Sequence, residues 1–107
     1  MRTNVKKYRH AVAGEAAVRL PAGVRGIGHW VPGPDGDQVR PVHWPTTTVA
    51  GVTIVVAGVQ DDRGRVVFAS ASVAAGEDGE PLDAVDCRRL AAELSVAADR
   101  LDRLRLN

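Results

Sequence analysis

Residues 47–74 read TTVAGVTIVVAGVQDDRGRVVFASASVA, and this stretch indicates a β-hairpin. Its first half, up to Val59, is rich in β-branched residues, whose side chains are stiff at χ1 and pack well on a pleated surface. The segment Asp61-Asp62-Arg63-Gly64 that follows is typical of a turn, because Asp side chains bond to nearby backbone and Gly64 tolerates a positive φ. A second strand completes the predicted hairpin, which pairs 47–59 with 65–74.

Both faces of the first predicted strand are apolar. One face carries Ala50, Val52, Ile54 and Val56, and the other carries Val49, Val55, Ala57 and Val59. A strand with one face in water would alternate between apolar and polar residues. We therefore expect both faces to be covered, one by a helix and the other by the N-terminal segment or a second subunit.

A helix is expected over residues 84–104, which contain no Gly or Pro. Asp83 is the expected N-cap, and Asp86 stands where the acid of a capping box would be. An apolar stripe with steps of three and four residues follows: Cys87, Leu90, Leu94, Ala97, Leu101 and Leu104. Burying its four leucines contributes about 6–12 kcal/mol gross, so the stripe needs a partner surface. A core helix on the sheet is favoured over a coiled-coil dimer, because the pattern runs under three heptads.

The opposite side of this helix carries Val85, Ala92 and Val96. Scattered exposed apolar residues are common, so these positions need no special explanation. The other interpretation is a small contact patch for another chain, and it makes Val85 and Val96 candidate partner-binding residues.

The first 45 residues are rich in Gly and Pro and are less clearly patterned. Residues 15–20 are expected to form a strand, although 4–20 would also fit a helix. A short strand is expected over residues 38–43. The predicted fold is therefore α+β: the hairpin 47–59/65–74, extended by one or two N-terminal strands, packs on the helix 84–104. The predicted organisation is a basic arm, residues 1–14, and one α+β domain, residues 15–107.

Composition excludes several classes of protein. The 107 residues are 45% apolar and 25% charged, with a net charge of +1, which is ordinary for one globular domain. No apolar run approaches the roughly 18 residues of a membrane span, and the lone Cys87 excludes an internal disulfide. The apolar stretch Ala11-Val12-Ala13 is too short for a signal peptide, so we expect a cytoplasmic protein with no membrane partner.

Two His-Trp pairs, His29-Trp30 and His43-Trp44, contain both tryptophans of the chain. Trp favours sites that are half apolar and half wet, so the pairs are candidates for a partner-binding surface. In a chain with only four aromatic residues, however, large side chains are also needed to fill the core. The structural interpretation is the favoured one.

The sequence contains no pattern that names a reaction. His29, His43 and Cys87 are metal-ligand types, but no CxxC, HxxxH or HExxH spacing accompanies them. Ser70 and Ser72 lie in a predicted strand and not in a nucleophile elbow. We therefore expect a non-enzymatic protein with no catalytic residue, no metal and no cofactor.

Basic residues are concentrated at the N-terminus. Residues 1–44 carry a net charge of +4 and residues 45–107 a net charge of −3. The side chains Arg2, Lys6, Lys7 and Arg9 precede the first acid, and four phosphate contacts would give a salt slope of about −3.6. The alternative function is accordingly an accessory nucleic-acid-binding protein that uses this arm.

Residues 49–104 resemble small uncharacterised proteins of actinobacteria and their phages. Those proteins have a Val-rich hairpin followed by a helix similar to Leu90-Ala-Ala-Glu-Leu94 and Ala97-Ala-Asp-Arg-Leu101. The excess of Arg over Lys, with abundant Ala and Val, is typical of a GC-rich coding sequence. The leading hypothesis is a protein-interaction module of such origin, because one helix cannot cover two apolar sheet faces. It would bind a partner protein or form a homodimer, through the uncovered sheet face or the His-Trp segment.

Overall fold

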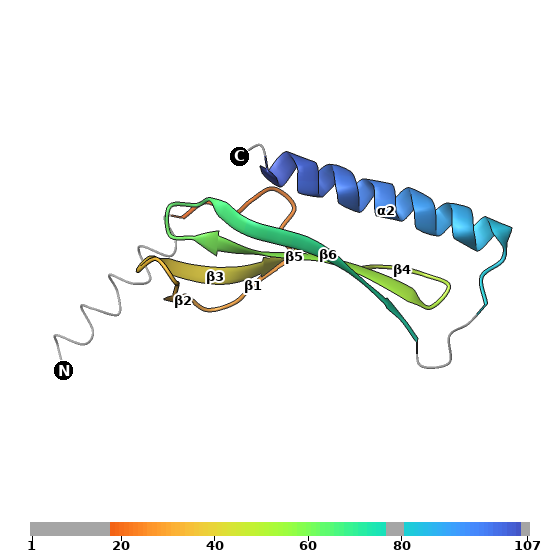
Figure 1. The fold of residues 1–107 in the computed structure, drawn as a ribbon, viewed down its shortest axis with the longest axis horizontal. Coiled ribbons are helices and arrows are strands. Elements are labelled where there is room, and N and C mark those ends of the chain that lie inside the picture. Colours follow the sequence, from red (N-terminus) through yellow and green to blue (C-terminus); the bar gives the residue numbers. More distant parts are fainter. Residues whose placement is uncertain (1–17, 77–80, 106–107) are drawn as a thin grey trace.

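The computed structural model describes residues 18–76 and 81–105. They form a six-stranded antiparallel sheet with a C-terminal helix along one face (Figure 1). The strands are β1 (Gly26–Ile27), β2 (Val31–Pro32), β3 (Gln38–His43), β4 (Thr47–Val49), β5 (Val52–Asp61) and β6 (Val66–Ala75), and the helix is α2 (Ala84–Arg105). The predicted α+β class, its hairpin, its added N-terminal strands and its covering helix are confirmed.

Strand β5 is the centre of the sheet. One of its edges pairs with β6 along almost its whole length, and the other edge pairs first with β4 and then with β3. The short strands β1 and β2 in turn pair with the outer edge of β3. Strand β6 is therefore an edge strand of this sheet.

The expectation that residues 47–59 form one strand is wrong. Ala50 and Gly51 both have positive φ values, 49° and 81°, and the chain reverses there so that β4 pairs with β5. Two central residues with positive φ are the mark of a type I′ hairpin turn, which in sequences usually shows Asn-Gly or Asp-Gly. Because the chain reverses, Val49 lies opposite Val52 and shares its face, contrary to the predicted assignment.

The turn between β5 and β6 has the predicted chemistry. Gly64 has a φ of 91°, and its N–H donates to the carbonyl of Asp61 at 3.1 Å. The Asp61 carboxylate accepts the backbone N–H groups of Arg63 and Arg65 at 3.0 and 2.9 Å. The predicted helix cap is also confirmed, since Asp83 Oδ1 accepts the N–H of Asp86 at 2.8 Å.

The core lies between α2 and the sheet face that it covers. Its buried members are Val42, Trp44, Ile54, Val56, Ala97 and Leu104. The predicted stripe on α2 thus enters the core at Ala97 and Leu104, with Leu90 and Leu101 half-buried. Cys87, the first residue of the predicted stripe, lies outside the core and is exposed. At 100° per residue it is rotated by about 80° around the helix axis from the buried Ala97.

Residues 18–25 extend the cover on the helix side of the sheet. The Ala22 carbonyl accepts the indole N–H of Trp44 at 2.9 Å, and Val24 packs against the core. Residues 18–20 are not a strand, because buried side chains bind the Val18 and Arg19 carbonyls in place of a neighbouring strand. The rest of the predicted strand, residues 15–17, and the basic arm, 1–14, lie outside the described residues.

Candidate functional site

Strand β6 presents a long edge that no other described strand pairs with. Its ten residues read VVFASASVAA and include neither a charged residue nor a proline. Natural sheets usually protect such an edge with lysine, proline, an inward-pointing charge or a covering element, because unpaired N–H and C=O groups are a template for another strand. A bulge near Val59 and Gln60 disturbs only the start of β6.

Large apolar side chains project beside this edge. Phe68 is 61% exposed and lies opposite Val59, on the sheet face away from α2. Val73 is 53% exposed and lies opposite the buried Ile54, on the face that α2 covers. The edge of β6 therefore has exposed apolar groups on both sides of the backbone ladder.

One flank of α2 faces the same way as the free edge of β6. Leu101 shares a depression with Val66 and Ala69 of β6, whereas Arg100 lies on the other side of the helix, beside Gly23. At 100° per residue, the strip of positions on the Leu101 side is uncharged from Cys87 to Leu101 and reaches Arg105 only at the end of α2. We call its five uncharged residues the α2 flank: Cys87, Ala91, Leu94, Ala98 and Leu101. Leu94, at its centre, is 37% exposed. The edge strand and the flank together form a two-layer apolar surface.

The sheet face away from α2 is covered by no element of residues 18–76 and 81–105. Val55, Ala57 and Val59 of β5 lie on it and are half-buried by their neighbours in the sheet. His43 lies on the same face, where a Cβ at Gly26 would collide with its imidazole ring. The second apolar face predicted from the sequence is therefore present, and the described part of the N-terminal segment lies on the opposite side.

The two predicted His-Trp pairs have unlike environments. Trp44 is completely buried, so it belongs to the core and not to an exposed recognition surface. Trp30 is half-buried, with the Arg40 guanidinium 4.5 Å from its ring centre. His29 and His43 are exposed. The structural interpretation thus holds for Trp44, and Trp30 stacks on a buried arginine.

The remaining candidates divide in two groups. Val85 and Val96 of α2 are both exposed and lie away from the core. The proposed nucleic-acid residues Arg2, Lys6, Lys7 and Arg9 lie outside the described residues.

A buried polar network, which the sequence did not predict, lies at one end of β5. Arg40 Nε donates to Gln60 Oε1 at 2.9 Å, and Gln60 Nε2 donates to the carbonyl of Arg19 at 2.6 Å. Burial would raise the pKa of Asp61, but hydrogen bonds from Arg65 and Arg63 outweigh it and hold the pKa below its usual value. Every buried side-chain nitrogen and oxygen in the described part of the chain has a partner. This network joins β3, β5 and residues 18–19 into one unit.

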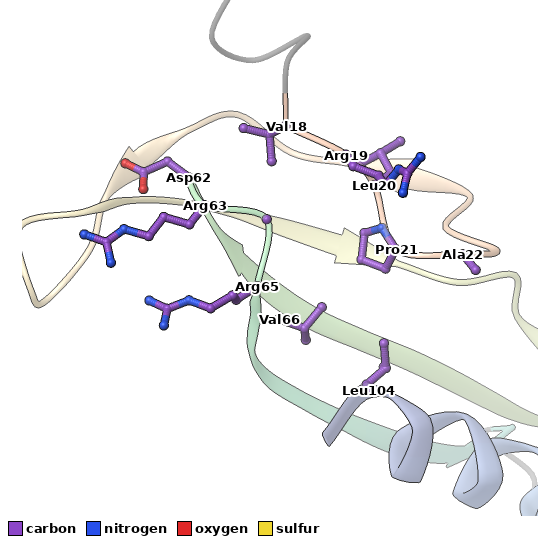
Figure 2. Close-up of a pocket in the computed structure, with 11 residues that line it drawn as sticks. Val18, Arg19, Leu20, Pro21, Ala22, Asp62, Arg63, Arg65, Val66 and Leu104 are labelled. Atoms are coloured by element: carbon purple, nitrogen blue, oxygen red, sulfur yellow. The ribbon is translucent and has the colours of Figure 1, made fainter. Parts of the chain in front are cut away.

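A depression of about 710 Å³ lies next to this network, between residues 18–22 and the β5–β6 turn (Figure 2). Arg19, Arg63 and Arg65 line it, but Arg63 and Arg65 extend away from Arg19. Arg65 is also committed to Asp61, with Nε 2.9 Å from Oδ2. Because the guanidinium groups do not converge, they do not form an anion site.

Among residues 18–76 and 81–105, no three His, Cys, Asp or Glu side chains are grouped as metal ligands. No described helix is both long and apolar enough to cross a membrane.

Comparison with models of protein families, with curated proteins and with solved structures found no match for this chain.

Proposed function

We propose that this chain is a small non-enzymatic protein-interaction module that associates with itself through β6. The main support is the outer edge of β6, which has ten uncharged residues and pairs with no other strand of the described sheet. We place the module in the cytoplasm and assign it an actinobacterial or phage origin, on the composition and the resemblance described above.

The driving force for association comes mainly from apolar burial. Backbone groups at a free edge bond to water, so pairing them with a strand exchanges one set of hydrogen bonds for another at modest net gain. Phe68 and Val73 contribute more, at about 1.5–3 kcal/mol each for full burial. Because Phe68 and Val73 lie on opposite faces of the sheet, a strand that pairs with β6 would partly bury both side chains.

A matched pair of substitutions tests this proposal. Val73→Lys places a charge beside the free edge, where natural sheets use charge to prevent pairing. Val96→Lys is its control, because Val96 is 52% exposed and lies on α2 away from the β6 edge. We expect the wild type to dimerise in sedimentation velocity, Val73→Lys to weaken the dimer by at least about tenfold, and Val96→Lys to behave as wild type.

The unfolding midpoint of each variant, measured at low concentration, separates lost association from lost folding. A wild type that remains monomeric over the whole concentration series would contradict the proposal. Equal weakening by both lysines would also contradict it, because the contact would then not be specific to β6.

A further inference from the structure

We infer that the partner is a second copy bound about a twofold axis perpendicular to the sheet, with β6 antiparallel to β6 and the α2 flanks in contact. This inference rests on the proposed function, because it takes β6 as the contact edge. It adds the orientation of the copies and a second, helical layer to the interface.

The apolar surface of the monomer has two layers, the edge of β6 and the α2 flank. A single extended peptide added to β6 would satisfy the strand edge but would leave Leu94 and its neighbours on the α2 flank in water. The partner must therefore offer a strand edge and, above it, an uncharged helix flank. The chain itself has that arrangement, and neither Val66–Ala75 nor the five residues of the α2 flank include a charge that would repel a second copy.

Symmetry limits how two copies can join through β6. Two identical edge strands have two twofold arrangements. An axis along the strands makes them parallel and places the two helices on opposite faces of the joined sheet. An axis perpendicular to the sheet makes the strands antiparallel and places both helices on the same face. Only the second arrangement brings Leu94 towards its copy, and antiparallel pairing is also slightly more stable per residue.

The spacing of strands and helices also fits the antiparallel arrangement. Neighbouring strands lie about 4.8 Å apart, and α2 contacts both β5 and β6. A helix centred between those strands would lie on the order of 10 Å from its copy, close to the 8–10 Å of packed helices. The strand of ten residues and the helix of 22 residues are each roughly 33 Å long, so both layers extend along the whole contact.

The size of this contact predicts a modest dimer. A strip roughly 33 Å long and two layers high buries on the order of 600 Å² per copy, at the lower end of specific interfaces. Ala91 and Ala98 border Leu94 on the flank, and small side chains there let two helices approach closely. We therefore expect Leu94 to lie near the twofold axis, against Leu94 of the second copy.

Disulfide trapping tests the inference, in a full chain whose Cys87 is first replaced by alanine. Ser70→Cys lies near the middle of β6 and reports strand pairing. Leu94→Cys reports contact between the helix flanks, and its control is Ser95→Cys, an exposed neighbour rotated by about 100°. Under mild oxidation at a dimeric concentration, we expect covalent dimers from Ser70→Cys and Leu94→Cys and none from Ser95→Cys.

Each other outcome is decisive. Trapping by Ser70→Cys without Leu94→Cys shows that β6 pairs with β6 while the helix flanks stay apart, and it overturns the inference while leaving the proposed function intact. A dimer that neither cysteine traps overturns the inference, and the response of that dimer to Val73→Lys decides whether β6 is still the contact edge. A monomeric parent chain overturns the proposed function itself.

Discussion

Asp61 is the residue on which the end of the β5–β6 hairpin depends most. It is only 2% exposed, yet its carboxylate accepts two backbone N–H groups and pairs with the Arg65 guanidinium. A charge-assisted hydrogen bond is roughly twice as strong as a neutral one, which explains how a carboxylate is tolerated in a buried position. Gln60 beside it satisfies the buried Arg40 in the same way.

The lowered pKa of Asp61 predicts acid sensitivity. The folded pKa lies below the ordinary value of 3.8, so this stabilisation is complete above pH 3.8 and is lost as the pH falls through the lower folded pKa. Asp61→Asn should cost about 1–3 kcal/mol at neutral pH and should flatten the dependence on acid, as measured by urea midpoints at several pH values. Asp62→Asn is the control, since Asp62 is exposed and its carboxylate receives one backbone N–H, from Gln38. Equal acid profiles for wild type and Asp61→Asn would contradict the assignment.

At the scale of elements, the sequence predicted what periodicity and capping govern. The sequence predicts a helix over 84–104, and the structure has it at Ala84–Arg105. The prediction succeeds because the cap at Asp83 and the lack of Gly and Pro are local properties. The short strand 38–43 was placed correctly as β3. The sequence does not predict the β4–β5 turn, because Ala50-Gly51 within a run of β-branched residues does not resemble a turn.

The candidate site was only partly predictable, for a related reason. The lack of charge in residues 66–75 is visible in the sequence, but whether a strand lies at an edge depends on the pairing of the whole sheet. The burial of Trp44 and the exposure of Leu94 likewise depend on where α2 crosses the sheet. The sequence pattern predicts a strand with two apolar faces. Which apolar side chains stay exposed depends on the order of the strands in the sheet.

The turn at Ala50 gives a prediction for the β4–β5 hairpin. A φ of 49° costs a residue with a Cβ, and the type I′ turn favours Asn or Gly there. Ala50→Asn should therefore stabilise the protein, by about 0.5–1 kcal/mol, measured as a higher urea midpoint. Gly51→Ala, at a φ of 81° with open space around it, should destabilise the protein through backbone strain alone. A loss of stability in Ala50→Asn would show that the turn has another geometry.

At the scale of the whole molecule, the two faces of the sheet are covered unequally. Helix α2 and residues 18–25 both lie on the same face of the sheet (Figure 1), and no other described segment covers the opposite face. An antiparallel dimer through β6 extends this asymmetric sheet sideways and keeps both open faces on one side. The exposed Phe68 of each copy would then lie next to the joint, on that common face.

Removal of residues 1–10 separates self-association from the nucleic-acid alternative. The deletion removes Arg2, Lys6, Lys7 and Arg9 but no residue of β6 or of the α2 flank. We expect the dimer constant, measured by sedimentation equilibrium, to be unchanged. A parallel titration with a short DNA duplex at two salt concentrations tests the arm, for which four phosphate contacts predict a salt slope of about −3.6 in the full chain. Binding that persists with the same slope after the deletion would contradict a role for the arm, and loss of the dimer would contradict an interface confined to β6 and α2.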